Sequence, residues 1–311
     1  MKPQDVTNKP GENAIFMVFG LNEGPEAAEK VKELCGSFAA LVKSMRNRFP
    51  EAEASAVMGF GAQAWTSLFP DLPRPKELKE FKAIQGEKHT AVSTPGDLFF
   101  HVRAKRRDVC HELASLISQA LQGAVTGIDE VQGFRYFDGR AIIGFVDGTE
   151  NPESYEAWAY AIIGQEDANF QGGSYAFVQK YLHNMEQWNA LSTEEQEKVV
   201  GRRKYNDLEL SDEEKPENAH NAVTNISDSD GAELKIVRAN MPFANPAKGE
   251  FGTYFIGYAG TFSTTKRMLE NMFIGEPVGN SDRLLDFSTA VTGTLFFVPT
   301  FEMLEELGEE E

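Results

Sequence analysis

The stretch "DLFFHVRAKRRDVCHELASLISQALQG", residues 97–123, decides the fold class, because an apolar strand runs directly into an amphipathic helix. Residues 252–275, "GTYFIGYAGTFSTTKRMLENMFIG", repeat this order of one strand and then one helix. The two stretches lie in different halves of the chain. Together they predict a duplicated structural unit.

The elements around each copy extend the repeat. The first half has the order βαββαβ of a ferredoxin-like unit, with strands expected at 14–21, 55–61, 97–104 and 125–137 and helices at 24–49 and 106–123. The second half echoes it, with strands at 174–182, 233–241, 252–260 and 293–299 and helices at 184–201 and 262–275. We therefore expect an α+β fold of two ferredoxin-like halves, residues 1–150 and 151–311, with antiparallel sheets and helices packed outside.

Charge and composition exclude several classes of protein. The 311 residues carry a formal net charge of −18, whereas phosphate binding needs clustered Lys and Arg, so neither nucleic acid nor a membrane is an expected partner. Acidic runs at 192–198, 207–217 and 302–311 are typical of solvated faces or loops. Two cysteines cannot form a disulfide framework, and neither a leader nor a membrane-spanning stretch is apparent. We expect a reduced, cytoplasmic protein.

The segment "AIIGFVDGTENP", residues 141–152, is the first candidate for function. It reads as a short apolar strand that runs into Asp147, with Gly148 directly after it. Asp-Gly and Asn-Pro are ordinary turn formers, so a plain turn explains the segment. A carboxylate held rigidly at a strand end and facing a pocket explains it as well. The residues alone leave both interpretations open.

Two further residues are candidates. His220 lies just past the acidic loop in "ENAHNAV", where a scaffold-held loop often carries function, although a lone histidine is more often a surface residue. Arg238 lies in "KIVRANMPFA", where strand alternation places Asn240 on the same face. A buried guanidinium needs a partner, which is either structural or functional. No Ser-His-Asp group, Cys-His group or glycine-rich phosphate loop is legible.

Taken together, the motifs resemble those of one family, the dye-decolourising peroxidases, which are haem enzymes built from two ferredoxin-like halves. "GFVDGTENP" contains the GxxDG signature of that family as Gly144, Asp147 and Gly148. The resemblance continues through residues 171–204, 217–223, 235–243 and 279–299 and covers most of the chain. The short chain is similar to the compact, cytoplasmic bacterial branch.

The resemblance implies a haem b cofactor with His220 as the proximal iron ligand, a role that suits a neutral imidazole. Asp282 matches the carboxylate that accepts a hydrogen bond from the second imidazole nitrogen, although Asp286 is close enough in sequence to leave the choice open. On the opposite side of the haem, Asp147 and Arg238 match residues that move a proton and stabilise charge during peroxide cleavage. Their relative importance stays open.

The resemblance implies further site residues and partners. Asn240 joins the catalytic group, Arg202 is expected near a haem propionate, Phe255 is expected to line the distal pocket, and Thr149 and Glu150 are expected to border the haem. Hydrogen peroxide and small aromatic electron donors are the implied substrates, and a homo-oligomer is the implied assembly. The chain ends in "LEELGEEE" without the extension that targets some family members into a nanocompartment, so we do not expect encapsulated cargo.

Three functions compete at this point. The first is a haem peroxidase, which the presence of both Asp147 and Arg238 favours. The second is a haem carrier or an iron-releasing protein, which needs only His220 and a pocket. The third is a metal-dependent hydrolase that uses Asp147 and Glu150, and it leaves His220 and Arg238 unexplained.

Overall fold

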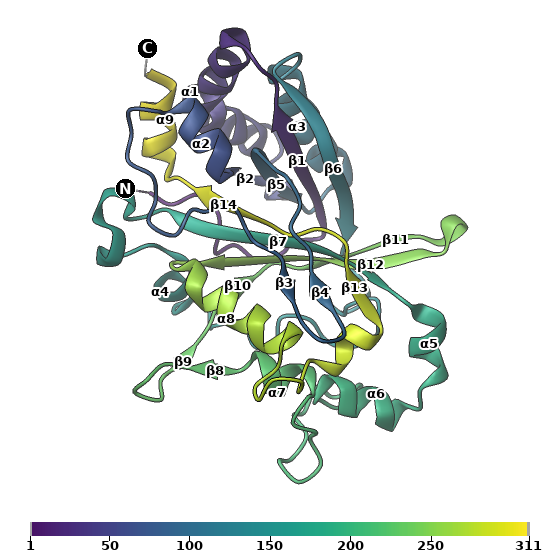
Figure 1. Cartoon of the computed structure of the whole chain (residues 1–311). Helices are drawn as coiled ribbons and strands as arrows, with labels where there is room; N and C mark the ends of the chain where they lie inside the picture. Colours follow the sequence, from purple (N-terminus) through teal and green to yellow (C-terminus); the bar gives the residue numbers. More distant parts are fainter. Residues whose placement is uncertain (1, 310–311) are drawn as a thin grey trace.

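The computed structural model describes residues 2–309 and confirms the ferredoxin-like order of the first half (Figure 1). Its four long strands pair in the order β6–β1–β5–β2, antiparallel throughout, which is the strand order of a βαββαβ unit. The elements are β1 (Asn13–Leu21), α1 (Pro25–Arg48), β2 (Ser55–Phe60), β5 (Leu98–Ala104), α3 (Arg107–Ala120) and β6 (Val125–Phe134). Short elements of this half are η1 (Pro50–Ala52), α2 (Ala62–Leu68), β3 (Ile84–Gln85) and β4 (Thr90–Ala91).

The second half repeats that topology in the order β14–β7–β12–β10. Its sheet contains β7 (Ser174–His183), β10 (Val237–Arg238), β11 (Met241–Asn245), β12 (Glu250–Ala259), β13 (Ser288–Ala290) and β14 (Thr294–Val298). Its helices are α4 (Ala157–Ala161), η2 (Gln165–Phe170), α5 (Met185–Ala190), α6 (Thr193–Val200), α7 (His220–Thr224), η3 (Pro246–Lys248), α8 (Phe262–Phe273), η4 (Arg283–Asp286) and α9 (Phe301–Glu309). A separate hairpin joins β8 (Ile226–Ser227) and β9 (Glu233–Leu234).

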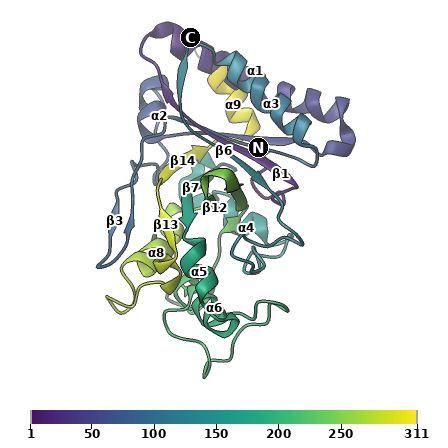
Figure 2. The same ribbon diagram turned by 90° about the vertical axis from the view of Figure 1, so that its right-hand side faces the viewer.

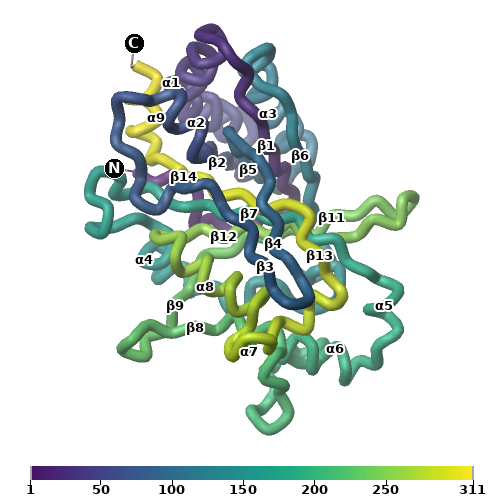
Figure 3. Tube along the Cα trace, in the orientation of Figure 1, coloured from purple at the N-terminus to yellow at the C-terminus, as the bar shows by residue number. Residues whose placement is uncertain are grey.

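The two halves share one sheet. Phe297 of β14 pairs with Phe60 of β2, so ten strands of the described chain form a continuous antiparallel sheet. Figure 2 shows α1, α3 and α9 above this sheet and α5, α6 and α8 below it. Figure 3 shows the β3–β4 hairpin of the first half extending down beside α8 and β13. Among residues 2–309, no helix has the length and apolar character that crossing a bilayer requires.

The acidic C-terminal run forms a solvated helix face, one of the two arrangements expected. Residues 302–309 lie in α9, which packs against α1, and residues 310–311 lie outside the described chain. Phe301, Leu304 and Leu307 are buried at helical spacing while the glutamates between them face solvent. Close packing needs glycine at position 308 of α9, because a Cβ there would lie 2.6 Å from the Cα of Gly36 in α1.

The apolar run at 141–146 was expected to be a strand, and this expectation is wrong. Gly144 has a φ of 94°, and the backbone N–H of Ala141 donates to the carbonyl of Phe145 at 2.8 Å, so the run folds into a tight turn. Ile143 and Phe145 are apolar because they pack with Trp188 in a small separate core. Asp147, which follows this run, therefore lies in a loop and not at the end of a strand.

Two other elements are shorter than expected. The helix at 184–201 is divided into α5 and α6, because Ser192 forms a capping box with Glu195 and starts a new helix. The strand at 233–241 is interrupted between β10 and β11. There the side-chain Oδ1 of Asn240 accepts the hydrogen bond from the backbone N–H of Ile256. A side chain replaces the backbone at that point in the ladder, which ends regular pairing.

His183, at the end of β7, is a buried histidine that links three strands. Its Nδ1 lies 2.7 Å from Oγ of Ser288 in β13, and its Nε2 lies 2.9 Å from Oγ1 of Thr253 in β12. Burial lowers the pKa of His183 to about 4. The folded protein therefore holds this histidine neutral well below the pH at which the unfolded chain protonates it.

We expect His183→Gln to reduce the acid sensitivity of folding. Below the ordinary pKa of about 6.5, the unfolded chain binds a proton that folded His183 does not bind, so stability is full above that pH and declines toward pH 4. Between pH 7 and pH 4.5, the free energy of unfolding of the wild type should fall by about 2–3 kcal/mol more than that of the variant. Urea unfolding at both pH values measures this difference. Equal losses in both proteins would contradict the assignment.

Candidate active site

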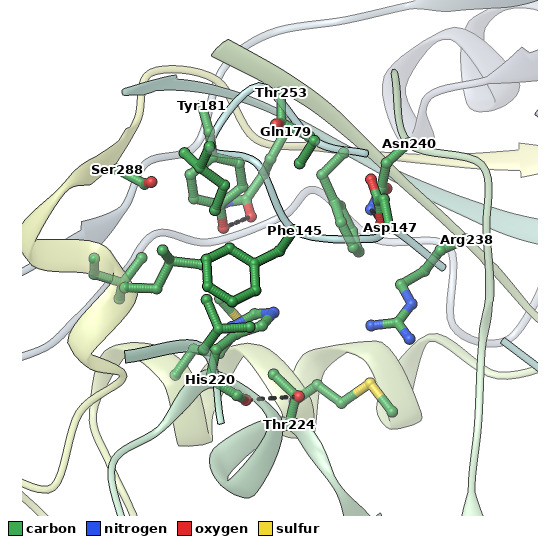
Figure 4. Close-up of a pocket in the computed structure, with 18 of the residues that line it drawn as sticks. Phe145, Asp147, Gln179, Tyr181, His220, Thr224, Arg238, Asn240, Thr253 and Ser288 are labelled. Atoms are coloured by element: carbon green, nitrogen blue, oxygen red, sulfur yellow. Dashed lines mark hydrogen bonds between the residues drawn. The ribbon is translucent and has the colours of Figure 1, made fainter. Parts of the chain in front are cut away.

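A cavity of about 1040 Å³, including its mouth, lies in the second half between the sheet and the helices α7 and α8 (Figure 4). Its walls are largely apolar and include Phe145, Phe255, Met268 and Leu269. Polar side chains also reach the cavity, among them Asp147, Gln179, His183, His220, Arg238 and Asn240. A large apolar cavity with a few convergent polar groups is typical of a site for a small molecule or cofactor.

His220 is the first residue of α7 and is held by a buried carboxylate. Its Nδ1 lies 2.6 Å from Oδ2 of Asp282, whose side chain is fully buried. The other oxygen, Oδ1, accepts the backbone N–H of Leu284 at 2.9 Å, which fixes the carboxylate at the start of η4. Asp286, the alternative partner, instead contacts Nε2 of His89 at 2.9 Å. The structure thus pairs His220 with Asp282.

The second nitrogen of His220 is available. Its side chain is 28% exposed and lines the cavity, and within residues 2–309 its Nε2 has no hydrogen-bond partner. His183 also lines the cavity, but hydroxyl groups occupy both of its ring nitrogens. Of these two cavity histidines, His220 is the one with a nitrogen free to bind a metal and a carboxylate to orient the ring.

Asp147, Arg238 and Asn240 lie together at another part of the same cavity (Figure 4). Nδ2 of Asn240 donates to Oδ1 of Asp147 at 3.2 Å, while Oδ1 of Asn240 is held by the backbone of β12. Burial lowers the pKa of Arg238, and the charges of Asp147 and Glu150 oppose that shift. Its Nε is buried without a partner in the described chain. This group combines a positioned carboxylate with a cation that has an unused donor.

Asn151 is a site residue that sequence reasoning missed. Its amide clamps the backbone of Arg238 in both directions: Nδ2 donates to the carbonyl at 2.8 Å, and Oδ1 accepts the N–H at 2.8 Å. The clamp ties β10 to the loop that carries Asp147. The "ENP" turn was the available signal, but a turn does not reveal which distant strand its side chain will meet.

The remaining predicted residues divide into two groups. Phe255 lines the cavity, and its place on the distal side stays a prediction. Thr149, Glu150 and Arg202 do not line it. Arg202 instead contacts Oε1 of Glu150 at 2.7 Å, and Thr149 donates to Oδ2 of Asp207 at 2.6 Å. Glu150 borders a smaller adjoining pocket together with Arg238, so this ion-pair network lies behind the cavity wall.

The cavity fits a haem in its chemistry. Its lining is mainly apolar, with a few polar side chains that converge on it. His220 offers an axial nitrogen whose ring is oriented by Asp282, as haem ligation requires. In contrast, no cluster of three or more His, Cys, Asp or Glu side chains suited to a metal ion occurs in residues 2–309. The hydrolase hypothesis therefore lacks a metal site among the described residues.

Comparison with known proteins gives the family. Residues 3–135 match the model described as "Dyp-type peroxidase, N-terminal", and residues 138–303 match "Dyp-type peroxidase, C-terminal". The chain is 66% identical to a dye-decolorizing peroxidase from Bacteroides thetaiotaomicron, with 99% of both chains covered and a TM-score of 0.96.

Two further solved structures are similar. A DypB variant of Rhodococcus jostii RHA1 in complex with haem is 47% identical over 99% of both chains, with a TM-score of 0.96. An encapsulated DyP-type peroxidase from Mycobacterium smegmatis is 51% identical over 98% of both chains, with a TM-score of 0.95. The predicted class, a haem peroxidase, is confirmed. Two family models that together span nearly the whole chain show that it belongs to the Dyp-type peroxidase family.

Proposed function

We propose that the chain reduces hydrogen peroxide at a haem b ligated by His220 and uses the oxidising power to oxidise small aromatic donors. One observation carries the proposal. A single cavity contains an imidazole oriented by a buried carboxylate, and it also contains the Asp147–Asn240–Arg238 group. Haem, when bound, supplies the redox chemistry that converts hydrogen peroxide to water.

His220 and Asp282 hold the cofactor in this proposal. Nε2 of His220 would bind the iron, and its Nδ1–H donates a hydrogen bond to the carboxylate of Asp282. The buried carboxylate increases the electron donation of the imidazole, which favours an oxidised metal. Because Leu284 fixes Asp282 from the other side, the ring cannot rotate without breaking a buried hydrogen bond.

Asp147 moves the proton. Its carboxylate accepts a proton from one oxygen of hydrogen peroxide and returns it to the other oxygen, which leaves as water. Asn240 holds the carboxylate in place through the 3.2 Å hydrogen bond. The guanidinium of Arg238 stabilises the negative charge that develops as the oxygen–oxygen bond breaks. Its unpartnered Nε is a donor that requires no other bond to be broken first.

A haem carrier or iron-releasing protein remains the second candidate, but nothing at the site favours it. A carrier needs the His220–Asp282 pair and a pocket, and it has no use for a clamped carboxylate and a buried arginine. Three hydrogen bonds hold these groups in place. Asn151 makes two of them to the backbone of Arg238, and Asn240 makes one to Asp147.

The weaker expectations are retained as proposals. Phe255 lines the distal side, and Arg202, which lies with Thr149 and Glu150 behind the cavity wall, is the cation nearest to a haem propionate. We further propose a cytoplasmic homo-oligomer. An encapsulated peroxidase of Mycobacterium smegmatis is closely similar to this chain, and co-purification with a shell protein tests whether this chain is encapsulated too.

His220→Ala should fold but bind haem weakly, because the cavity then lacks an axial ligand. Added imidazole should restore the binding in part, since it can occupy the space of the lost ring. Titration of the apoprotein with haemin, followed at the Soret band, measures both effects. His89→Ala is the matched control, because His89 lies outside the cavity and contacts Asp286. Wild-type affinity in His220→Ala without imidazole would refute the assignment.

Asp147→Asn should slow the reaction of the haem-loaded protein with hydrogen peroxide by about 10²–10⁴-fold, because the amide cannot shuttle a proton. Haem affinity should stay close to that of the wild type. Stopped-flow absorbance measures the rate, and Asp138→Asn is the control, since Asp138 is an exposed carboxylate paired with Arg140 in the same loop. An unchanged rate would indicate that Arg238 has the main role in peroxide cleavage. Arg238→Leu would then show the larger loss of rate.

A further inference from the structure

Gln179 is a buried polar residue in the cavity wall for which the proposed mechanism has no use. It lies in the middle of β7, is fully buried, and lines the cavity. Strand alternation places Tyr181 and His183 on the same face of β7. Both of these also line the cavity, so one strand contributes a row of three polar side chains.

The orientation of the Gln179 amide is fixed. The hydroxyl of Tyr181 donates to Oε1 of Gln179 at 2.7 Å (Figure 4). Burial raises the pKa of Tyr181, so the hydroxyl keeps its proton and remains a donor. Nε2 of Gln179 is therefore the free end, and it has no hydrogen-bond partner in residues 2–309. A buried donor left unpaired is costly, so such groups usually have a partner in the functional state.

Only two buried side-chain donors that lack a partner within residues 2–309 line this cavity, Gln179 and Arg238. Sheet register places them on the same face. Gln179 pairs with Phe255, and Gly257, two residues along β12, pairs with Arg238. Directly paired residues share a face, and two strand spacings separate β7 from β10, about 10 Å. Figure 4 shows this face on the upper side of the cavity and His220 on the lower side.

We propose that Gln179 is a further ligand-binding residue, whose Nε2 donates a hydrogen bond to a small acceptor ligand, such as water or peroxide, held in the cavity opposite His220. Tyr181 is its positioning residue. The inference rests on the proposed haem site and deepens it: the ligand is held from two sides, by charged groups near Arg238 and by an uncharged amide near Tyr181. An uncharged donor can bind a neutral oxygen ligand without adding charge to the cavity.

Fluoride binding to the haem-loaded protein tests the proposal, because fluoride is a single-atom acceptor and its affinity does not depend on turnover. Gln179→Met keeps the side-chain volume and removes the donor. Its fluoride dissociation constant, measured by absorbance titration at one fixed pH, should be about tenfold or more above that of the wild type. Tyr181→Phe should weaken binding less, because the amide remains but is free to rotate.

Val178→Ala is the matched control, because Val178 is buried beside Gln179 on the opposite face of β7. It should lower the thermal stability and leave fluoride affinity unchanged. A Gln179→Met protein that binds haem and binds fluoride within twofold of the wild type would overturn the inference and leave the proposed function intact. A wild-type protein that does not bind haem would overturn both.

Discussion

The 2.6 Å hydrogen bond between His220 and Asp282 is the interaction on which the site depends. It determines which imidazole nitrogen is free and which way the ring faces. A buried carboxylate is stable only when its oxygens are satisfied, and here His220 and the backbone of Leu284 each satisfy one. Removing the imidazole would leave a buried charge poorly paired. The hydrogen bonds that orient His220 therefore also stabilise η4.

The ferredoxin-like unit of the first half, residues 13–134, supports this pair without contributing to the cavity lining. Its β3–β4 hairpin extends beside α8, and His89, between the two strands, contacts Asp286 at the end of η4. The loop that follows β6 carries Asp147, and Asn151 fastens that loop to β10. The duplicated fold thus places His220 and Asp282 at the starts of α7 and η4 in the second half, and it places Asp147, the proposed proton carrier, near the junction between the halves.

Sequence patterns predicted the repeated strand–helix order because alternation and helical spacing are local properties, and β1, α1, β5 and α8 begin and end close to the expected residues. The prediction of a strand at 141–146 was wrong because a short apolar segment is equally compatible with a turn packed on Trp188. Family resemblance indicated His220, Arg238 and Asp282. Gln179 and the Asn151 clamp were not predictable, because their importance comes from partners distant in sequence, which only the folded chain brings together.

The reduction potential of the haem-loaded protein tests the central claim most directly. Asp282→Asn removes the negative charge behind His220 and should raise the ferric–ferrous potential by on the order of 60 mV or more, because the oxidised iron loses electron donation. Asp286→Asn, which alters an exposed carboxylate in the same short helix, should leave the potential unchanged. A potential in Asp282→Asn equal to that of the wild type, or an equal shift in both variants, would contradict the account.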